Sequence, residues 1–131
     1  MRELIVYDTN VFVSYFLARK KSGTIKTVVD QIFDKKTVCV FSRQIIAEYD
    51  KVLHYPKFGF SHREIRTLLN FIRRNGLYVN PSPTFTPFTD ESDKCFYDAA
   101  VAAKAHWLIT GNKRHFPNEP FIVTAANIWN K

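Results

Sequence analysis

The sequence contains few cysteines and few glycines, and it has no long hydrophobic run. Its two cysteines, Cys39 in a predicted buried strand and Cys95 in a predicted helix, are too few and too far apart for a disulfide framework or a zinc site. No apolar stretch approaches the roughly 20 residues that span a bilayer, and the N-terminus does not resemble a secretory signal. We therefore expect a soluble, cytoplasmic protein with two buried free thiols and no membrane partner.

The scarcity of glycine and the placement of histidine and serine exclude several catalytic classes. The four glycines do not have the spacing of a phosphate-binding or dinucleotide-binding loop. No serine lies in a nucleophile elbow, and the four histidines do not have the spacing of metal ligands. Among the histidines, only His115 is placed to contact a phosphate, because it follows Lys113 and Arg114. Solvated or capping roles are expected for the others.

Size and charge narrow the remaining choices. The 131 residues, 46% hydrophobic and 24% charged, are the size of a single globular domain spanning residues 1–131. The formal net charge is +7 at pH 7, and a basic surface favours the capture of polyanions such as nucleic acid. The basic residues fall in short groups at positions 19–21, 35–36, 73–74 and 113–115. Each group taken alone is more typical of a solvated helix end or loop.

Short apolar runs alternate along the chain with stretches of helical periodicity. Strands are expected at residues 4–7, 38–41, 107–109 and 121–123, with a further short one at 77–79. Helices are expected up to Phe16, from Thr24, from Ser42 to about Leu53, from Ser61 to Gly76, over 93–105, and in a short closing segment to Trp129. This alternation implies right-handed crossovers. We therefore expect an α/β fold with three layers, α/β/α, around a mainly parallel sheet of four or five strands.

Capping residues and helix breakers mark the ends of these helices. Thr24 and Ser42 are expected N-caps, and Ser61 followed three residues later by Glu64 forms a capping box. The apolar stripe of the helix that follows Ser61 consists of Ile65, Leu68, Leu69 and Ile72. Gly76 is expected to end that helix.

Acidic and amide side chains occur at positions that a parallel sheet brings to one edge. Asp8 follows the first strand, Asn112 follows the strand at 107–109, and Asp93 lies in the first turn of a helix. Ligands of open α/β sheets gather at the carboxyl ends of the strands. Hard cations such as Mg²⁺ and Mn²⁺ require oxygen ligands, usually a few carboxylates with waters and substrate phosphate. Together with Glu48, in the middle of the third helix, these acids would supply such a site.

Each acid also has a simpler explanation. Glu48 fits an exposed helix acid that pairs with Lys51 or Lys57, and Asp93 fits an acid that only stabilises a helix N-terminus. Asp98 lies five residues after Asp93, about 140° around an ideal helix. The two therefore lie on different faces, and at most one of them is expected to be a direct metal ligand, unless a water or a local bend connects the other.

Four segments together resemble a PIN domain, most closely the branch of toxins from toxin–antitoxin pairs related to the VapC-like ribonucleases. They are the Asp8-Thr9-Asn10 opening, the Ser42-Arg43-Gln44-Ile45-Ile46-Ala47-Glu48 helix, Asp90-Glu91-Ser92-Asp93 with Phe96-Tyr97-Asp98, and Leu108-Ile109-Thr110-Gly111-Asn112. The resemblance covers essentially the whole chain, and the segments occur in the right order. Single pieces are weakly specific, whereas all four at these separations are specific.

This resemblance implies a metal-dependent endoribonuclease. In that family the acids that match Asp8, Glu48 and Asp93 hold one or two Mg²⁺ or Mn²⁺ ions, which activate a water for attack on a phosphodiester. Asp98 matches an often acidic position, and is expected to be an auxiliary ligand. A fourth catalytic acid is common where this chain has Asn112, so the amide leaves both the second metal and the level of activity open.

The resemblance also implies contacts and partners. Thr110 would hydrogen-bond within the strand end, and the RNA-contacting positions would be Thr110, Lys113, Arg114 and His115. Family members are usually homodimers, and toxin members are silenced by an antitoxin protein. A second interpretation is a PIN-like module that binds RNA or protein with weak catalysis or none, which Asn112 and the modest count of 12 acids would favour.

Overall fold

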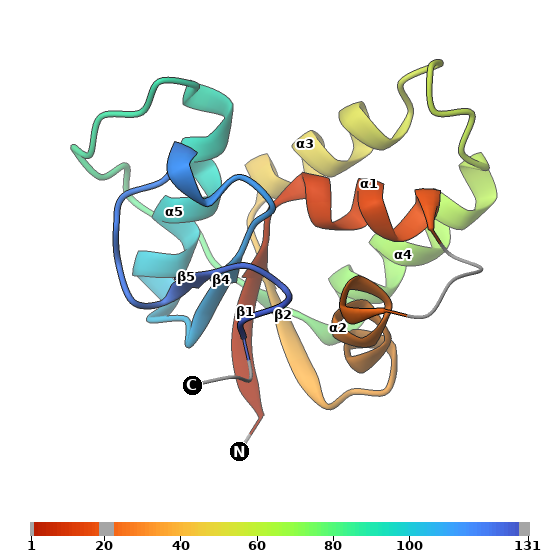
Figure 1. The fold of residues 1–131 in the computed structure, drawn as a ribbon, viewed down its shortest axis with the longest axis horizontal. Coiled ribbons are helices and arrows are strands. Elements are labelled where there is room, and N and C mark those ends of the chain that lie inside the picture. Colours follow the sequence, from red (N-terminus) through yellow and green to blue (C-terminus); the bar gives the residue numbers. More distant parts are fainter. Residues whose placement is uncertain (1, 19–22, 129–131) are drawn as a thin grey trace.

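The structure, a computed structural model, describes residues 2–18 and 23–128. Its centre is a parallel sheet whose five strands are ordered β3-β2-β1-β4-β5 (Figure 1). The strands are β1 (Glu3–Tyr7), β2 (Thr37–Phe41), β3 (Leu77–Tyr78), β4 (Trp107–Ile109) and β5 (Ile122–Val123). The expected α/β class and parallel pairing are confirmed. Of the basic groups, positions 19–21 lie outside the described residues.

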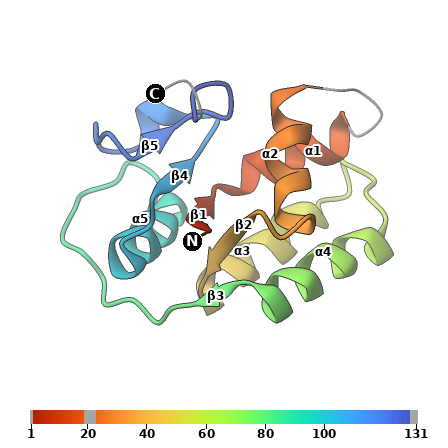
Figure 2. The same cartoon turned by 90° about the horizontal axis from the view of Figure 1, so that it is seen from below.

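In the part of the chain that the structure describes, five α-helices and one short 3₁₀ helix connect the strands. They are α1 (Thr9–Leu17), α2 (Thr24–Phe33), α3 (Arg43–Leu53), α4 (His62–Asn75), α5 (Glu91–Ala103) and the 3₁₀ helix η1 (Lys113–His115). Figure 2 shows α5 on one face of the sheet and α1 to α4 on the other. This follows from right-handed crossovers, since the chain moves outward from β1 to β3 and then returns past β1 to β4. The expected α/β/α layering is thus present.

The core explains why these segments fold as they do. The last three residues of β1, Ile5, Val6 and Tyr7, are fully buried, as expected for a central parallel strand. The apolar stripe of α4 is buried as predicted, and Ser61 accepts a hydrogen bond from the Glu64 backbone N–H. Within the described ranges, no helix is long and apolar enough to cross a bilayer. Both cysteines are free.

Several sequence expectations about local structure were wrong. Thr24 is the first residue of α2, and Gly23 is its N-cap. The fifth helix begins at Glu91 because the Asp90 side chain accepts the Ser92 backbone N–H, and it ends before Lys104, which adopts the left-handed conformation. Residues 125–128 form turns in place of a closing helix, and Trp129 lies outside the described residues. Cys95 is only partly buried.

Candidate active site

Asp8 lies at the carboxyl end of β1, where the strand ends and α1 begins. It is 5% exposed. Thr110, which follows β4, donates a hydrogen bond from Oγ1 to Asp8 Oδ2 over 2.7 Å. The backbone N–H of Asp8 donates to the Ile109 carbonyl over 2.9 Å. Because β1 and β4 are neighbours in the sheet, the end of β4 holds the Asp8 carboxylate in place.

Thr110 is buried, and its hydroxyl group has a second contact. Its Oγ1 accepts a hydrogen bond from the backbone N–H of Asn112 over 3.0 Å, and the residue is 1% exposed. The sequence suggested that Thr110 contacts RNA. In the structure the hydroxyl connects Asp8 to the turn after β4, so Thr110 orients Asp8 and does not face the surface.

Glu48 is brought towards Asp8 by its neighbour on α3, Tyr49. The Tyr49 hydroxyl donates to the carbonyl of Tyr7, the residue before Asp8, over 2.5 Å. Glu48 also lies 3.6 Å from the Lys51 ammonium, so the surface ion pair that the sequence left open is present. Burial is the main cause of the raised pKa of Asp8, and the Glu48 carboxylate adds a smaller contribution in the same direction. The ion pair of Glu48 with Lys51 is therefore confirmed, whereas its role as a metal ligand stays a prediction.

Asp93 lies in the first turn of α5 and faces His115 from η1. Its Oδ2 is 3.9 Å from His115 Nδ1, and its side chain is 16% exposed. Burial raises the pKa of Asp93 to about 6, with repulsion from Asp8 and Asp90 adding to the effect and the His115 ring opposing it. Asp90 caps the helix, so Asp93 is not the acid that caps α5.

Asp8, Glu48 and Asp93 come from three different elements, and each lies in the electrostatic field of the others. Burial also raises the pKa of Asp8, although the Thr110 hydrogen bond opposes this shift. The thiol of Cys95 on α5 lies near the same charges. Burial raises the pKa of this thiol to about 12, and the negative charges of Glu48 and Asp8 add to the shift. A partly buried concentration of negative charge is costly by itself and is relieved by a bound cation.

The side chains present fit a hard divalent cation. The donors are carboxylate oxygens, which Mg²⁺ and Mn²⁺ prefer. Within residues 2–18 and 23–128, no three His, Cys, Asp or Glu side chains are close enough to form a metal-binding group. Mg²⁺ usually keeps several waters and binds through one or two carboxylates. The three acids therefore suit an ion held partly through water.

Asp98 has other contacts. It is 8% exposed, and its Oδ1 accepts hydrogen bonds from the backbone N–H and the hydroxyl of Thr84 at 3.1 and 2.6 Å. Its Oδ2 accepts from Lys94 Nζ at 3.1 Å. Asp98 thus holds the segment between β3 and α5 in place, which differs from the auxiliary metal ligand suggested by the sequence.

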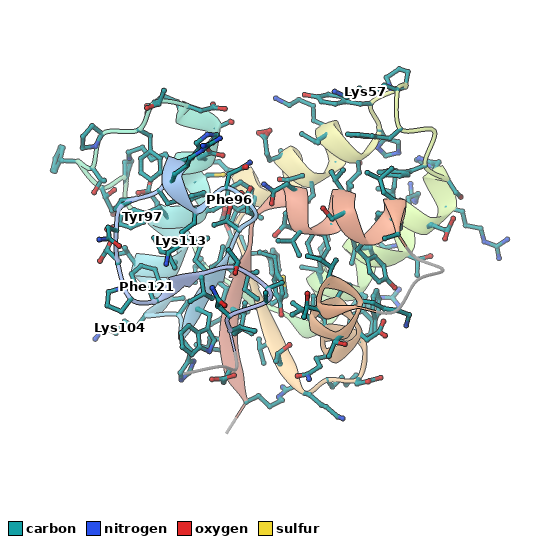
Figure 3. All side chains as sticks on the ribbon, viewed as in Figure 1. Lys57, Phe96, Tyr97, Lys104, Lys113 and Phe121 are labelled. Atoms are coloured by element: carbon teal, nitrogen blue, oxygen red, sulfur yellow. The ribbon has the colours of Figure 1, made fainter. Side chains whose placement is uncertain are left out.

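The turn after β4 presents the basic residues to solvent. Asn112 precedes η1, and Lys113, Arg114 and His115 are all exposed. Figure 3 shows Lys113 on the side of the molecule where β4 and β5 lie. It shows Lys57 beyond the C-terminal end of α3. Asn10 steadies this turn, since its Oδ1 accepts the Gly111 backbone N–H over 3.2 Å.

Three residues that shape the site were missed from the sequence: Tyr49, Asn10 and Cys95. Asn10 was quoted only as part of a motif, and Tyr49 only as a neighbour of Glu48. A buried tyrosine needs a partner for its hydroxyl group, which is the one sequence signal that pointed to Tyr49. Nothing in the sequence indicated which carbonyl it reaches. Cys95 follows Asp93 by two residues, and only the burial of α5 shows that its thiol lies near the acids.

The raised pKa of Asp93 predicts that the metal-free protein is less stable at neutral than at mildly acidic pH. The folded protein binds this proton more tightly than the unfolded chain, whose aspartates titrate near 3.9, so the stabilisation is lost as pH rises through about 6. Urea unfolding at about pH 7.5 and about pH 5.5 should show a gain on acidification that Asp93→Asn reduces. An equal gain in both proteins would contradict the assignment.

A family model described as PIN domain matches residues 4–114, which include Asp8, Glu48, Asp93 and all of η1 except its last residue. No curated protein matches the chain.

Proposed function

The chain belongs to the PIN domain family, whose members are typically nucleases, and on that premise we propose that it is a divalent-metal-dependent endoribonuclease. One observation supports this proposal most strongly. Asp8, Glu48 and Asp93 converge from three elements on the carboxyl edge of the sheet. Burial raises the pKa of Asp8 and of Asp93, and the Glu48 carboxylate adds to both shifts. A protein that only bound RNA would have no use for concentrated negative charge facing a polyanion.

Different residues of the chain would bind the metal and orient its ligands in such a reaction. Asp8, Glu48 and Asp93 would hold one or two Mg²⁺ or Mn²⁺ ions, which supply activation of a water and stabilisation of the leaving oxygen. Thr110 orients Asp8 through its 2.7 Å hydrogen bond. Tyr49 fixes α3 against the end of β1.

Substrate binding is proposed for the basic residues of η1. Lys113, Arg114 and His115 are exposed beside the acids, where they would attract the phosphates that the carboxylates repel. His115 also lies 3.9 Å from Asp93, so a phosphate bound there would be adjacent to the proposed metal ligands. Asn112 would orient a water or the RNA without adding a charge.

The test is cleavage of a labelled single-stranded RNA by the purified protein with Mn²⁺, with Mg²⁺ and with EDTA. Cleavage should require the metal, and Glu48→Gln should reduce it at least about tenfold, since a metal ligand is lost. Glu64→Gln on α4 is the matched control and should cleave as the parent does. Salt-sensitive RNA binding without metal-dependent cleavage would overturn the proposal and favour the RNA-binding module.

We further propose that this nuclease acts in the cytoplasm as a homodimeric toxin silenced by an antitoxin protein. The support is the resemblance of the four sequence segments to the VapC-like branch. A small reading frame beside the gene, encoding a DNA-binding protein that restores growth when both are expressed, would bear out this role. Growth arrest that the neighbouring product does not relieve would leave a general RNA-processing nuclease.

A further inference from the structure

Two histidines for which the sequence suggested only solvated or capping roles meet at the junction of α3 and α4. His54 is the C-cap of α3, and His62 is the first residue of α4. The distance between His54 Nε2 and His62 Nδ1 is 2.8 Å, and the ring centroids are 5.0 Å apart. They are eight residues apart in the sequence, so only the turn between the helices brings the two ring nitrogens together.

Asp50 fixes the orientation of the first ring. His54 Nδ1 lies 2.8 Å from the Asp50 carbonyl and 3.2 Å from its Oδ1. A ring nitrogen with two oxygen neighbours carries the proton, so the lone pair of the neutral ring is on Nε2. That lone pair accepts the hydrogen bond from His62 Nδ1–H, so a metal ion bound by both nitrogens would replace this proton, which is released to water. A histidine whose distal nitrogen is held by a carboxylate or carbonyl is the usual arrangement of a metal-binding imidazole.

We propose that His54 Nε2 and His62 Nδ1 form a two-histidine site for a borderline transition metal ion such as Zn²⁺, separate from the carboxylate site at Asp8. Imidazole nitrogens suit Zn²⁺, whereas Mg²⁺ prefers oxygen. Tetrahedral Zn²⁺ with bonds of about 2.0–2.1 Å places two nitrogens about 3.3 Å apart. The observed 2.8 Å therefore needs an opening of only about half an ångström.

The two rings lie at the surface of the protein. Both histidines are exposed, so waters complete the coordination. Lys57, in the turn between the two helices, has its ammonium group over the rings of Tyr55 and Phe58, at 5.9 and 5.3 Å from their centroids. The negative charge of Asp50 favours a cation at this position. The bound ion would join α3, the helix that carries Glu48, to α4.

The experiment follows the ring nitrogens directly, by nuclear magnetic resonance of isotope-labelled histidine during a Zn²⁺ titration. It uses the Asp8→Asn protein, so that the acid site contributes little. His54 Nε2 and His62 Nδ1 should shift together, and Mg²⁺ should leave both unchanged. His54→Gln and His62→Gln, which retain hydrogen-bonding side chains, should each weaken Zn²⁺ binding at least tenfold. Asp50→Asn should weaken it less, since the backbone carbonyl remains.

A matched control separates this site from other exposed histidines. His115→Gln should leave the Zn²⁺ affinity unchanged. The proposal is overturned if Zn²⁺ shifts the His115 signals and not those of His54 and His62, or if His54→Gln binds Zn²⁺ as tightly as the parent. Neither result depends on RNA cleavage. The nuclease proposal can therefore fail while the two-histidine site is confirmed, and the two-histidine site can fail while the nuclease proposal is confirmed.

Discussion

Asp8→Asn is expected to abolish RNA cleavage while making the metal-free protein more stable. The amide keeps an oxygen that can accept the Thr110 hydrogen bond, but it cannot bring a charge to a metal ion. A loss of more than about 100-fold in metal-dependent cleavage is expected, because a direct ligand of the proposed ion is removed. Stability should rise, since the folded pKa of Asp8 is raised by burial and its ionised form is disfavoured in the fold.

Both effects are measured on the same preparation, cleavage with Mn²⁺ and thermal unfolding in EDTA at neutral pH. Asp30→Asn is the matched control, because Asp30 is a surface carboxylate paired with Lys26 on α2. This variant should neither lose RNA cleavage nor gain thermal stability. Cleavage at the parental rate would show that Asp8 is not a ligand. A loss of activity together with a loss of stability would mean that the carboxylate is needed for folding.

Gly76→Ala is expected to have the largest effect on stability. A Cβ at this position would lie 2.4 Å from the Cys39 carbonyl oxygen and 2.6 Å from the Ile72 carbonyl oxygen. Both atoms belong to the backbone, so β2 or the end of α4 has to move. We expect a loss of about 2–4 kcal/mol in the free energy of unfolding, measured by urea denaturation.

Gly59→Ala separates this steric effect from backbone strain. Gly59 has φ of 63°, and nothing lies within 4 Å of an added Cβ. Its cost is expected to be about 1 kcal/mol, from the left-handed conformation alone. If Gly76→Ala costs no more than Gly59→Ala, the close packing of α4 on β2 is not what requires glycine at position 76.

Gly76 also shows where sequence interpretation was right for a different reason. The glycine was expected to end α4 because helix C-termini often adopt a left-handed conformation. Its φ is −86°, which any residue adopts. The requirement comes from the strand packed beside it, so the position of the helix end was predicted correctly and its cause was not.

The sequence by itself determined the features that depend on neighbours a few residues away. The N-caps at Ser42 and Ser61 and the buried stripe of α4 were predictable, because capping and helical periodicity operate over three or four residues. The alternation of strands and helices likewise implied a parallel sheet. The positions of Asp8, Glu48 and Asp93 relative to these elements predicted which edge of the sheet would carry the acids.

Only the tertiary structure decided which atoms meet at that edge and elsewhere. The hydrogen bond from Thr110 to Asp8 joins residues 102 positions apart, and it exists because β4 pairs with β1. The same holds for Asp98, which binds Thr84, and for His54, which faces His62. A carboxylate or an imidazole is recognised from its sequence neighbours as a candidate ligand. Its actual partner depends on strand order and on the path of a loop, because these set which groups lie within hydrogen-bonding distance.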